Sequence, residues 1–243
     1  MRRALVLFLA LHSNSIFSQE KTESRELAGH MGSREALLVL HAIQRDDAGW
    51  TVTGEYLILP TMTRRFLEGE RSPQLGVTTL KEGNTAILFG RPPTGELRGT
   101  WSSGVFKGTR FGPGGQERER FEFSEEFPSM DGYAASVRCQ VGDERYTSFL
   151  SYAVEAGRVK SFEWRSKLAP GGHMCIIVNP AQQAMSGGLR LAAGGCSVTL
   201  REVGQSVKVA AEYCTQVCGS EAYLEPMLID RRGNCMLLRP EVK

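Results

Sequence analysis

Few residues of this chain are of the types that carry acid-base or metal chemistry. Beyond residue 18 the histidines are His30, His41 and His173. His173 lies close to Cys175, but zinc sites favour closely paired ligands, such as Cys-x2-Cys with His-x3-His. A catalytic histidine needs a second acid-base group beside it, which this spacing does not supply. We therefore expect no metal site, and we interpret His173 as a residue of a turn.

Carboxylates alternate with arginines in residues 117–123, which read ERERFEF. Paired carboxylates hydrolyse glycosides when they lie about 5 to 9 Å apart, a distance that sequence spacing does not give. Alternating charge is more typical of the solvated face of a strand or of a guarded sheet edge. The sequence also has no Gly-x-Ser-x-Gly elbow and no phosphate-binding loop. We therefore expect no catalytic activity and no cofactor.

Short apolar runs separated by glycine, proline and asparagine must position these residues. Trp50, Val52, Tyr56 and Ile58 alternate with more polar neighbours, which predicts a strand with an inner and an outer face. Runs spaced by roughly 8 to 12 residues are typical of an antiparallel sandwich or barrel, and no convincing helical stripe is present. The predicted strands of the first half are 36–43, 50–59, 65–67, 77–82, 86–89, 97–101 and 119–123.

The six cysteines lie together in the C-terminal part of the chain: Cys139, Cys175, Cys196, Cys214, Cys218 and Cys235. Residues 125–132, which precede all of them, combine charge, a proline and a turn dipeptide, and this composition indicates a boundary. We predict an all-β protein with two domains, an antiparallel barrel or sandwich over 35–128 and a smaller disulfide-linked β domain over 129–243. Residues 19–34 are polar and are interpreted as a flexible lead-in.

The start of the chain has the features of an export signal. Arg2-Arg3 precede an apolar run at residues 4–11, and Ser18 is a small residue suited to cleavage before Gln19. This run is much shorter than the roughly 20 apolar residues that span a bilayer. We predict a signal peptide over 1–18, no membrane span, and a periplasmic or secreted protein in which the cysteines form disulfides.

A hairpin around Gly204-Gln205 bears on the disulfide pairing. Pairing 196–203 with 206–213 across this turn places Leu200 opposite Val209. In this register Cys214 points to the face opposite Cys196, which argues against a bond between them. A direct bridge from Cys214 to Cys218 is strained, so we expect these two cysteines to bond to different partners.

The charge balance indicates which partners the chain does not favour. The chain has 29 Lys+Arg and 27 Asp+Glu, and the excess disappears when Arg2 and Arg3 are removed with the leader. Because the remaining charges are balanced and interspersed, nothing indicates the basic surface that nucleic acids or anionic lipids require.

Two short patterns resemble those of exported bacterial proteins. Residues 54–56, 67–69, 80–82 and 95–101 resemble the pattern G-x-Y, L-x-G, L-x-E, G-x-L-x-G-T-W of exported bacterial β-domains. Cys196 followed by residues 214–219, CTQVCG, resembles the cysteine-bearing tail of proteins associated with the LprI-type lysozyme-inhibitor group. The resemblance implies an all-β envelope protein and, at most, an inhibitor-like role.

Arginine and aromatic residues near turns are the candidate binding positions, because both are enriched at interaction hot spots. They are Arg64, Arg65, Phe66, Trp101, Lys107, Arg110, Phe111, Arg231 and Arg232. We expect an exported binding protein for a protein of the cell envelope, such as an inhibitor or immunity-type protein for an envelope hydrolase. An exported hydrolase acting through Glu119 or His173 and a structural envelope component are the alternatives.

Overall fold

The computed structural model describes residues 21–44, 49–72, 75–85, 91–169, 171–219 and 224–238. Strands make up almost all regular structure in these ranges, and the short α1 (Thr215–Cys218) is the one helix among them. The prediction of an all-β chain is therefore confirmed. Among the described residues, no helix has the length and apolar character that crossing a membrane requires. The predicted signal peptide, 1–18, and the predicted strand 86–89 lie outside the described residues.

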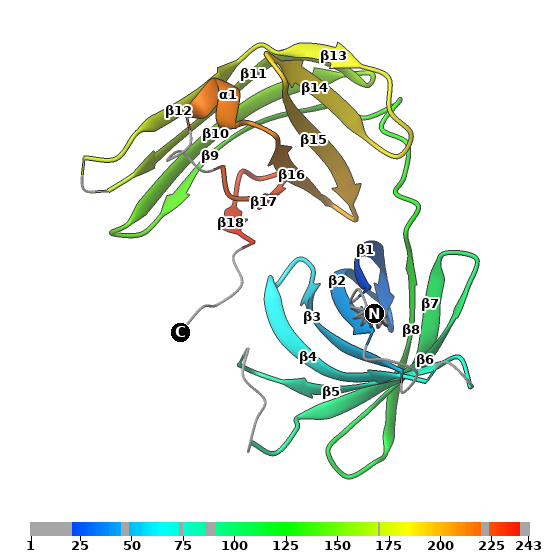
Figure 1. Ribbon diagram of the computed structural model, residues 1–243. Helices are drawn as coiled ribbons and strands as arrows, with labels where there is room; N and C mark the ends of the chain where they lie inside the picture. The colour runs from blue at the N-terminus through cyan, green and yellow to red at the C-terminus, as the bar shows by residue number, and fades with distance from the viewer. Residues whose placement is uncertain are drawn as a thin grey trace, which may run out of the picture.

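The first half of the described chain is a closed barrel in which each strand pairs antiparallel with the next and β1 pairs with β8 (Figure 1). Its strands are β1 (Thr22–Met31), β2 (Arg34–Gln44), β3 (Trp50–Ile58), β4 (Thr63–Arg71), β5 (Val77–Gly83), β6 (Gly95–Ser102), β7 (Val105–Phe111) and β8 (Glu117–Ser124). Closure pairs every strand on both sides, so the barrel has no free edge.

Alternation along each strand fills the barrel interior with apolar side chains. The predicted inner face of β3 is confirmed, because Val52, Tyr56 and Ile58 belong to the barrel core and the partly buried Trp50 packs against it. Fully buried residues of the other strands complete the core: Leu27, Leu38, Leu80, Leu97, Phe106 and Phe123. Gly108 on β7 is required by close packing of the strands, since a Cβ there would lie 1.9 Å from the Arg98 carbonyl oxygen.

The predicted flexible lead-in over 19–34 is wrong for most of its length. Residues 22–31 form β1, which is hydrogen-bonded to β2 along its length and to β8 near its C-terminal end. The inward positions of β1 include Leu27 and Met31, both fully buried. The intervening position is Gly29, where a Cβ would lie 2.0 Å from the Glu122 carbonyl oxygen. The strand was missed because the small and charged residues on its inner face hide the apolar alternation.

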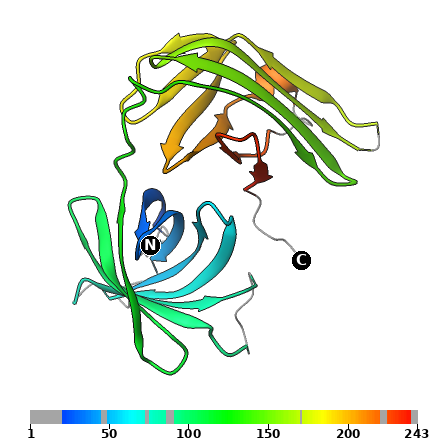
Figure 2. The same cartoon turned by 180° about the vertical axis from the view of Figure 1, so that it is seen from behind.

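The second half forms two antiparallel sheets whose inner faces share one hydrophobic core (Figures 1 and 2). One sheet has the order β12-β11-β10-β9 and the other the order β13 to β18. The bounds are β9 (Ala135–Gly142), β10 (Tyr146–Glu155), β11 (Arg158–Leu168), β12 (Met174–Val178), β13 (Ala181–Gln183), β14 (Leu189–Ala193), β15 (Cys196–Val203), β16 (Ser206–Glu212), β17 (Met227–Asp230) and β18 (Cys235–Leu237). Trp164, at the centre of this core, donates its indole N–H to Ser148 Oγ at 2.9 Å.

The two sheets of the second half form a β-sandwich, and this sandwich meets the barrel through a separate apolar cluster. Leu37 and Leu57 lie on the outer face of the barrel and pack with Phe127 of the connecting segment and with Val203 and Leu228 of the sandwich. All five side chains are buried, although the first two point away from the barrel interior. Leu37 and Leu57 can therefore be apolar at outward positions of the barrel because the second half of the chain covers them.

The predicted hairpin around Gly204-Gln205 is confirmed, since β15 pairs with β16 and Leu200 lies opposite Val209. The prediction against a bond between Cys196 and Cys214 is wrong, because these residues are joined with a Cα–Cα distance of 4.2 Å. The register is correct, but β16 ends at Glu212 and Tyr213 adopts a positive φ of 59°. This left-handed residue ends the strand alternation and turns the chain, so that Cys214 returns to Cys196.

The other disulfides are Cys139–Cys235 and Cys175–Cys218. Cys214 and Cys218 therefore bond to different partners, as predicted, and the segment containing α1 is held at both ends. Cys139 on β9 and Cys175 on β12 lie on the two edge strands of one sheet. Both edges of this sheet are thus covalently linked to segments on the other side of the core.

The disulfides should differ in their effect on stability. The pairs Cys139–Cys235 and Cys196–Cys214 close chain segments with sequence separations of 96 and 18 residues. Loop-closure entropy then predicts that the variant Cys139→Ala/Cys235→Ala loses about 1.5 kcal/mol more unfolding free energy than Cys196→Ala/Cys214→Ala. Urea denaturation of both variants measures this difference. The reverse order would show that native contacts, and not the unfolded chain, set the effect.

Candidate functional site

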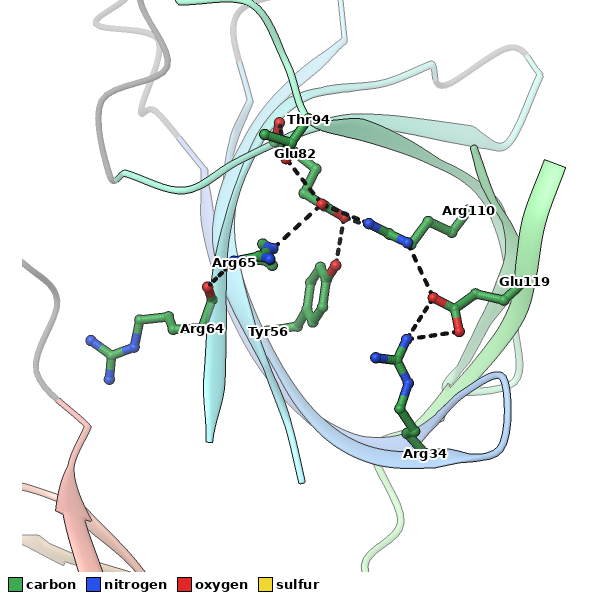
Figure 3. A network of polar contacts seen from close by, with 8 residues as sticks. All are labelled: Arg34, Tyr56, Arg64, Arg65, Glu82, Thr94, Arg110 and Glu119. Carbon is green, nitrogen blue, oxygen red and sulfur yellow. Dashed lines mark hydrogen bonds and ion pairs between the residues drawn. The ribbon is translucent and has the colours of Figure 1, made fainter. Parts of the chain in front are cut away.

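Ionisable side chains gather at the end of the barrel where β1 turns into β2 and β5 leads to β6 (Figure 3). At their centre is Glu82, the last inward-facing residue of β5, whose carboxylate is completely inaccessible to solvent. It lies on the inner face because it is two positions after Leu80, a core residue of the same strand. A buried carboxylate without partners is strongly unfavourable, so its contacts decide what this cluster can do.

Glu82 is held by cationic and hydroxyl donors from four other segments of the chain. Arg110 on β7 donates through Nε to Oε2 at 2.7 Å and through Nη2 to Oε1 at 2.9 Å, a bidentate pair. Tyr56 on β3 donates its hydroxyl to Oε2 at 2.5 Å, and Thr94 donates to Oε1 at 3.0 Å. Arg65 on β4 lies 3.6 Å from Oε1 through its Nε. Both carboxylate oxygens are therefore fully engaged.

These contacts fix the protonation states of the cluster. Burial by itself raises the pKa of Glu82, but the hydrogen bonds from Arg110 and Tyr56 outweigh it and hold this pKa below its ordinary value. Burial, reinforced by the nearby carboxylate, raises the pKa of the Tyr56 hydroxyl far above its ordinary value. At neutral pH Glu82 is ionised and Tyr56 is a proton donor that does not titrate. Neither group is poised to exchange protons near neutral pH, as a general acid or base would be.

The network continues to the barrel rim. Arg110 Nη1 lies 3.2 Å from Glu119 Oε1, and Arg34 Nη2 donates to both oxygens of Glu119 at 2.7 and 2.9 Å. Figure 3 shows Arg110, Glu119 and Arg34 reaching inward from one side of the barrel, and Arg65 from the opposite side. Alternating guanidinium and carboxylate groups thus close this end of the barrel, and each carboxylate has at least two arginine partners. The arrangement acts as a structural closure of the apolar interior.

The opposite end of the barrel is closed by arginines stacked on tryptophans. The guanidinium of Arg71 lies 4.3 Å from the ring centre of Trp50, and that of Arg25 lies 4.9 Å from the ring centre of Trp101. Glu23 forms ion pairs with both arginines at 3.3 to 3.4 Å. Trp101 was a candidate binding residue, but its place here is a layer that seals the barrel.

An open groove lies on the outer face of the barrel, beside the cluster that joins it to the sandwich. Its volume is about 350 Å³, and residues from both halves of the chain line it. The barrel supplies Leu37, Val39, Leu57, Phe66 and Leu67, together with the more polar His41, Thr53, Glu55 and Glu68; the sandwich and the C-terminal segment supply Lys208, Pro226 and Leu238. Mostly apolar walls with a few polar groups are the usual character of a binding site.

The candidate binding residues do not form one surface. Arg65 and Arg110 meet at Glu82, while Arg64 lies 3.5 Å from Glu55 on the outer side of β4. Phe66 is buried and lines the groove. Arg98 stacks on Phe111, Arg231 pairs with Glu202, and Lys107 and Arg232 are exposed. Phe66 is therefore the predicted residue that contributes to the groove.

The carboxylates and histidines considered for catalysis are also separated. Glu119 faces into the barrel with its two arginines, whereas Glu117 and Glu122 are exposed. His30 and His173 are exposed, and His41 borders the groove and contacts Ser24 Oγ at 3.1 Å through Nδ1. Among the described residues, no group of three or more His, Cys, Asp or Glu is arranged to hold a metal ion.

Glu82 and Tyr56 are the central residues that sequence reasoning did not select. A signal for both was present, since each occupies the same face of its strand as neighbouring core residues. A carboxylate at an inward position predicts a buried cationic partner, and Arg110 was already a candidate. Comparisons with family models, with curated proteins and with solved structures find no match for this chain.

Substitution of Glu82 should be severe at neutral pH and milder in acid. Glu82→Gln leaves Arg110 and Arg65 near a neutral group, so we expect a loss of about 3 to 5 kcal/mol in unfolding free energy. Because the folded pKa of Glu82 is lowered, its ionised form stabilises the protein above the unfolded value of 4.5, and this contribution is lost as pH falls through the folded pKa. The difference between wild type and variant should therefore shrink in acid, as urea denaturation at pH values from neutral to acidic measures.

The matched control is Glu119→Gln, which removes a carboxylate of the same network at a more exposed site. We expect it to cost less than Glu82→Gln. Equal losses for the two variants, or a pH-independent loss for Glu82→Gln, would contradict the assignment of Glu82 as the centre of the network.

Proposed function

We propose that this chain is a non-catalytic binding protein that recognises a partner protein through the groove between the barrel and the sandwich. The observation that carries the proposal is the composition of this groove. Leu37, Val39 and Leu57 form apolar walls, and Glu55, Glu68 and Lys208 lie at positions where charged groups can orient a ligand. Such a site can take apolar side chains of a protein segment and read the charges beside them.

The state of the ionisable residues supports recognition over catalysis. Glu82 and Glu119 are each neutralised by arginines, and the shifts in the pKa of Glu82 and Tyr56 move both groups away from neutral titration. A hydrolase needs a carboxylate or histidine free to exchange protons with a substrate. No arrangement of Glu119 or His173 in the structure favours that alternative.

The covalent structure supports the proposed compartment. Three disulfides join the described cysteines, and such bonds persist in oxidising surroundings. Together with the export signal expected at residues 1–18, they support a periplasmic or secreted location. The partner is then a protein of the cell envelope, and the resemblance of the cysteine-bearing tail makes an envelope hydrolase held inactive by this chain the form of the proposal to test first.

The test uses a substitution that fills the groove. Thr53 is an exposed residue of β3 within the groove, and Thr53→Trp adds a large ring there. We expect the chain beginning at Gln19 to retain a stoichiometric partner from periplasmic extract and the Thr53→Trp variant to lose at least about tenfold in affinity, since an obstructed apolar anchor costs 1 to 2 kcal/mol or more. Calorimetric titration with the purified partner measures this loss.

The control is Thr100→Trp, the same change at an exposed position of β6, outside the groove. It should bind as tightly as wild type. Unchanged affinity in Thr53→Trp would place recognition elsewhere. Turnover of an envelope substrate by the purified chain would reject a purely non-catalytic role.

A further inference from the structure

The outer face of the four-stranded sheet carries a second groove, separate from the one beside the barrel. Its volume is about 320 Å³, and it crosses the solvent side of β9, β10, β11 and β12. The sheet lies on the side of the sandwich turned away from the barrel (Figures 1 and 2). Nothing in the proposed function uses this face.

Positive charge is in excess along this groove. Arg138, Arg165 and Lys167 line it, and Glu163 is the one carboxylate among its lining residues. Glu163 is ion-paired with Arg165, whereas Arg138 and Lys167 take part in none of the ion pairs found between described residues. The exposed Arg138 and Lys167 thus give this groove a local excess of positive charge. Over residues 19–243, by contrast, Lys and Arg are equal in number to Asp and Glu. This local excess favours a ligand with negative charge.

An aromatic ring and a row of apolar side chains complete the surface. Phe149 on β10 lies between the guanidinium groups of Arg138, at 5.1 Å, and Arg165, at 5.9 Å. On β12, next to the cationic strand, Met174, Ile176 and Val178 are 53%, 47% and 55% exposed. Pairing of β11 with β12 sets Lys167 opposite Met174 and Arg165 opposite Ile176. Cationic and apolar stripes therefore run side by side.

This face is also held rigid. Its edge strands β9 and β12 are anchored by the disulfides Cys139–Cys235 and Cys175–Cys218. A surface fixed in this way loses little conformational entropy when a ligand binds. Rigid cationic and aromatic anchors beside exposed apolar groups are features of protein interaction sites.

We propose that this face binds an acidic segment of a partner protein, with carboxylates over Arg138 and Lys167 and apolar side chains over Met174 and Ile176. Neighbouring strands lie about 4.8 Å apart, so the groove from β9 to β12 spans roughly 14 Å, the length of about four extended residues. A sulfated or carboxylated glycan would satisfy the cations but leave the apolar row of β12 exposed to water. The stripes together therefore favour a peptide.

The experiment is a fluorescence anisotropy titration of the full chain from Gln19 with a short labelled peptide in which leucines precede glutamates. A matched peptide carries glutamine in place of glutamate. We expect binding of the acidic peptide, at least about tenfold weaker binding of the glutamine peptide, and affinity that falls with added salt. The double substitution Arg138→Gln/Lys167→Gln should weaken binding of the acidic peptide by about tenfold or more.

The control is Arg158→Gln/Lys160→Gln, which removes two exposed cations from the far end of β11. It should bind within about twofold of wild type, because charges beyond a Debye length are screened. No binding of the acidic peptide at about 1 mM, or equal affinity in the two double variants, overturns the proposal. Binding of a sulfated glycan fragment without binding of the peptide also overturns it. Thr53→Trp should leave this affinity unchanged, so the test is independent of the groove beside the barrel.

Discussion

The contact between the barrel and the sandwich is the constraint on which the proposed recognition site depends. Leu37 and Leu57 point out of the barrel and are buried only because Phe127, Val203 and Leu228 cover them. Each such side chain contributes about 1.5 to 3 kcal/mol when it leaves water. Since the walls of the neighbouring groove come from both halves of the chain, their spacing is set by this apolar contact.

Polar contacts around this cluster fix the orientation of the two halves. The backbone N–H of Gln205 donates to Glu35 Oε2 at 3.0 Å, Arg64 donates to the carbonyl oxygen of Leu237 at 3.3 Å, and Lys208 is ion-paired with Glu26. Directional bonds of this kind add modest stability but exclude other orientations. Lys208 links this contact to the proposed recognition site, because it also lines the groove.

Inside the barrel, the buried network of Glu82 disfavours alternative strand registers in a similar way. A shift of one residue in β5 would move Glu82 to the outside and leave Arg110 and Arg65 facing an apolar interior without their partner. The network therefore penalises incorrect strand register, which a closed sheet of uniformly apolar inner residues would tolerate more easily. Carboxylate and arginine residues in this barrel therefore specify the fold. Their presence alone does not indicate a catalytic site.

Much of the architecture could be predicted from local patterns, and the remainder depends on contacts distant in sequence. Alternation revealed the inner face of β3, and the Gly204-Gln205 turn gave the register of β15 and β16. β1 was missed because its fit depends on Gly29 approaching β8, which lies about a hundred residues later. The Cys196–Cys214 bond was missed because the strand alternation ends at Tyr213, which adopts a positive φ. Only glycine commonly adopts such a φ, so the sequence gives no indication of it at a tyrosine.

The groove itself could not be predicted, since it is formed only when Lys208, Pro226 and Leu238 meet the outer face of β2, β3 and β4. The hot-spot criterion selected Phe66, yet most of the walls are aliphatic residues that resemble ordinary strand positions. The location of the groove thus depends on how the two halves of the chain pack together, and no sequence motif indicates it.

The most direct test of the proposed recognition site is methyl NMR spectroscopy of the isotopically labelled chain from Gln19, titrated with a partner protein captured in the proposed affinity experiment. The largest shift changes should fall on the methyl groups of Leu37, Val39 and Leu57, which line the groove on the outer face of the barrel. Changes confined to methyl groups of the barrel interior, such as Leu80 and Leu97, would contradict it.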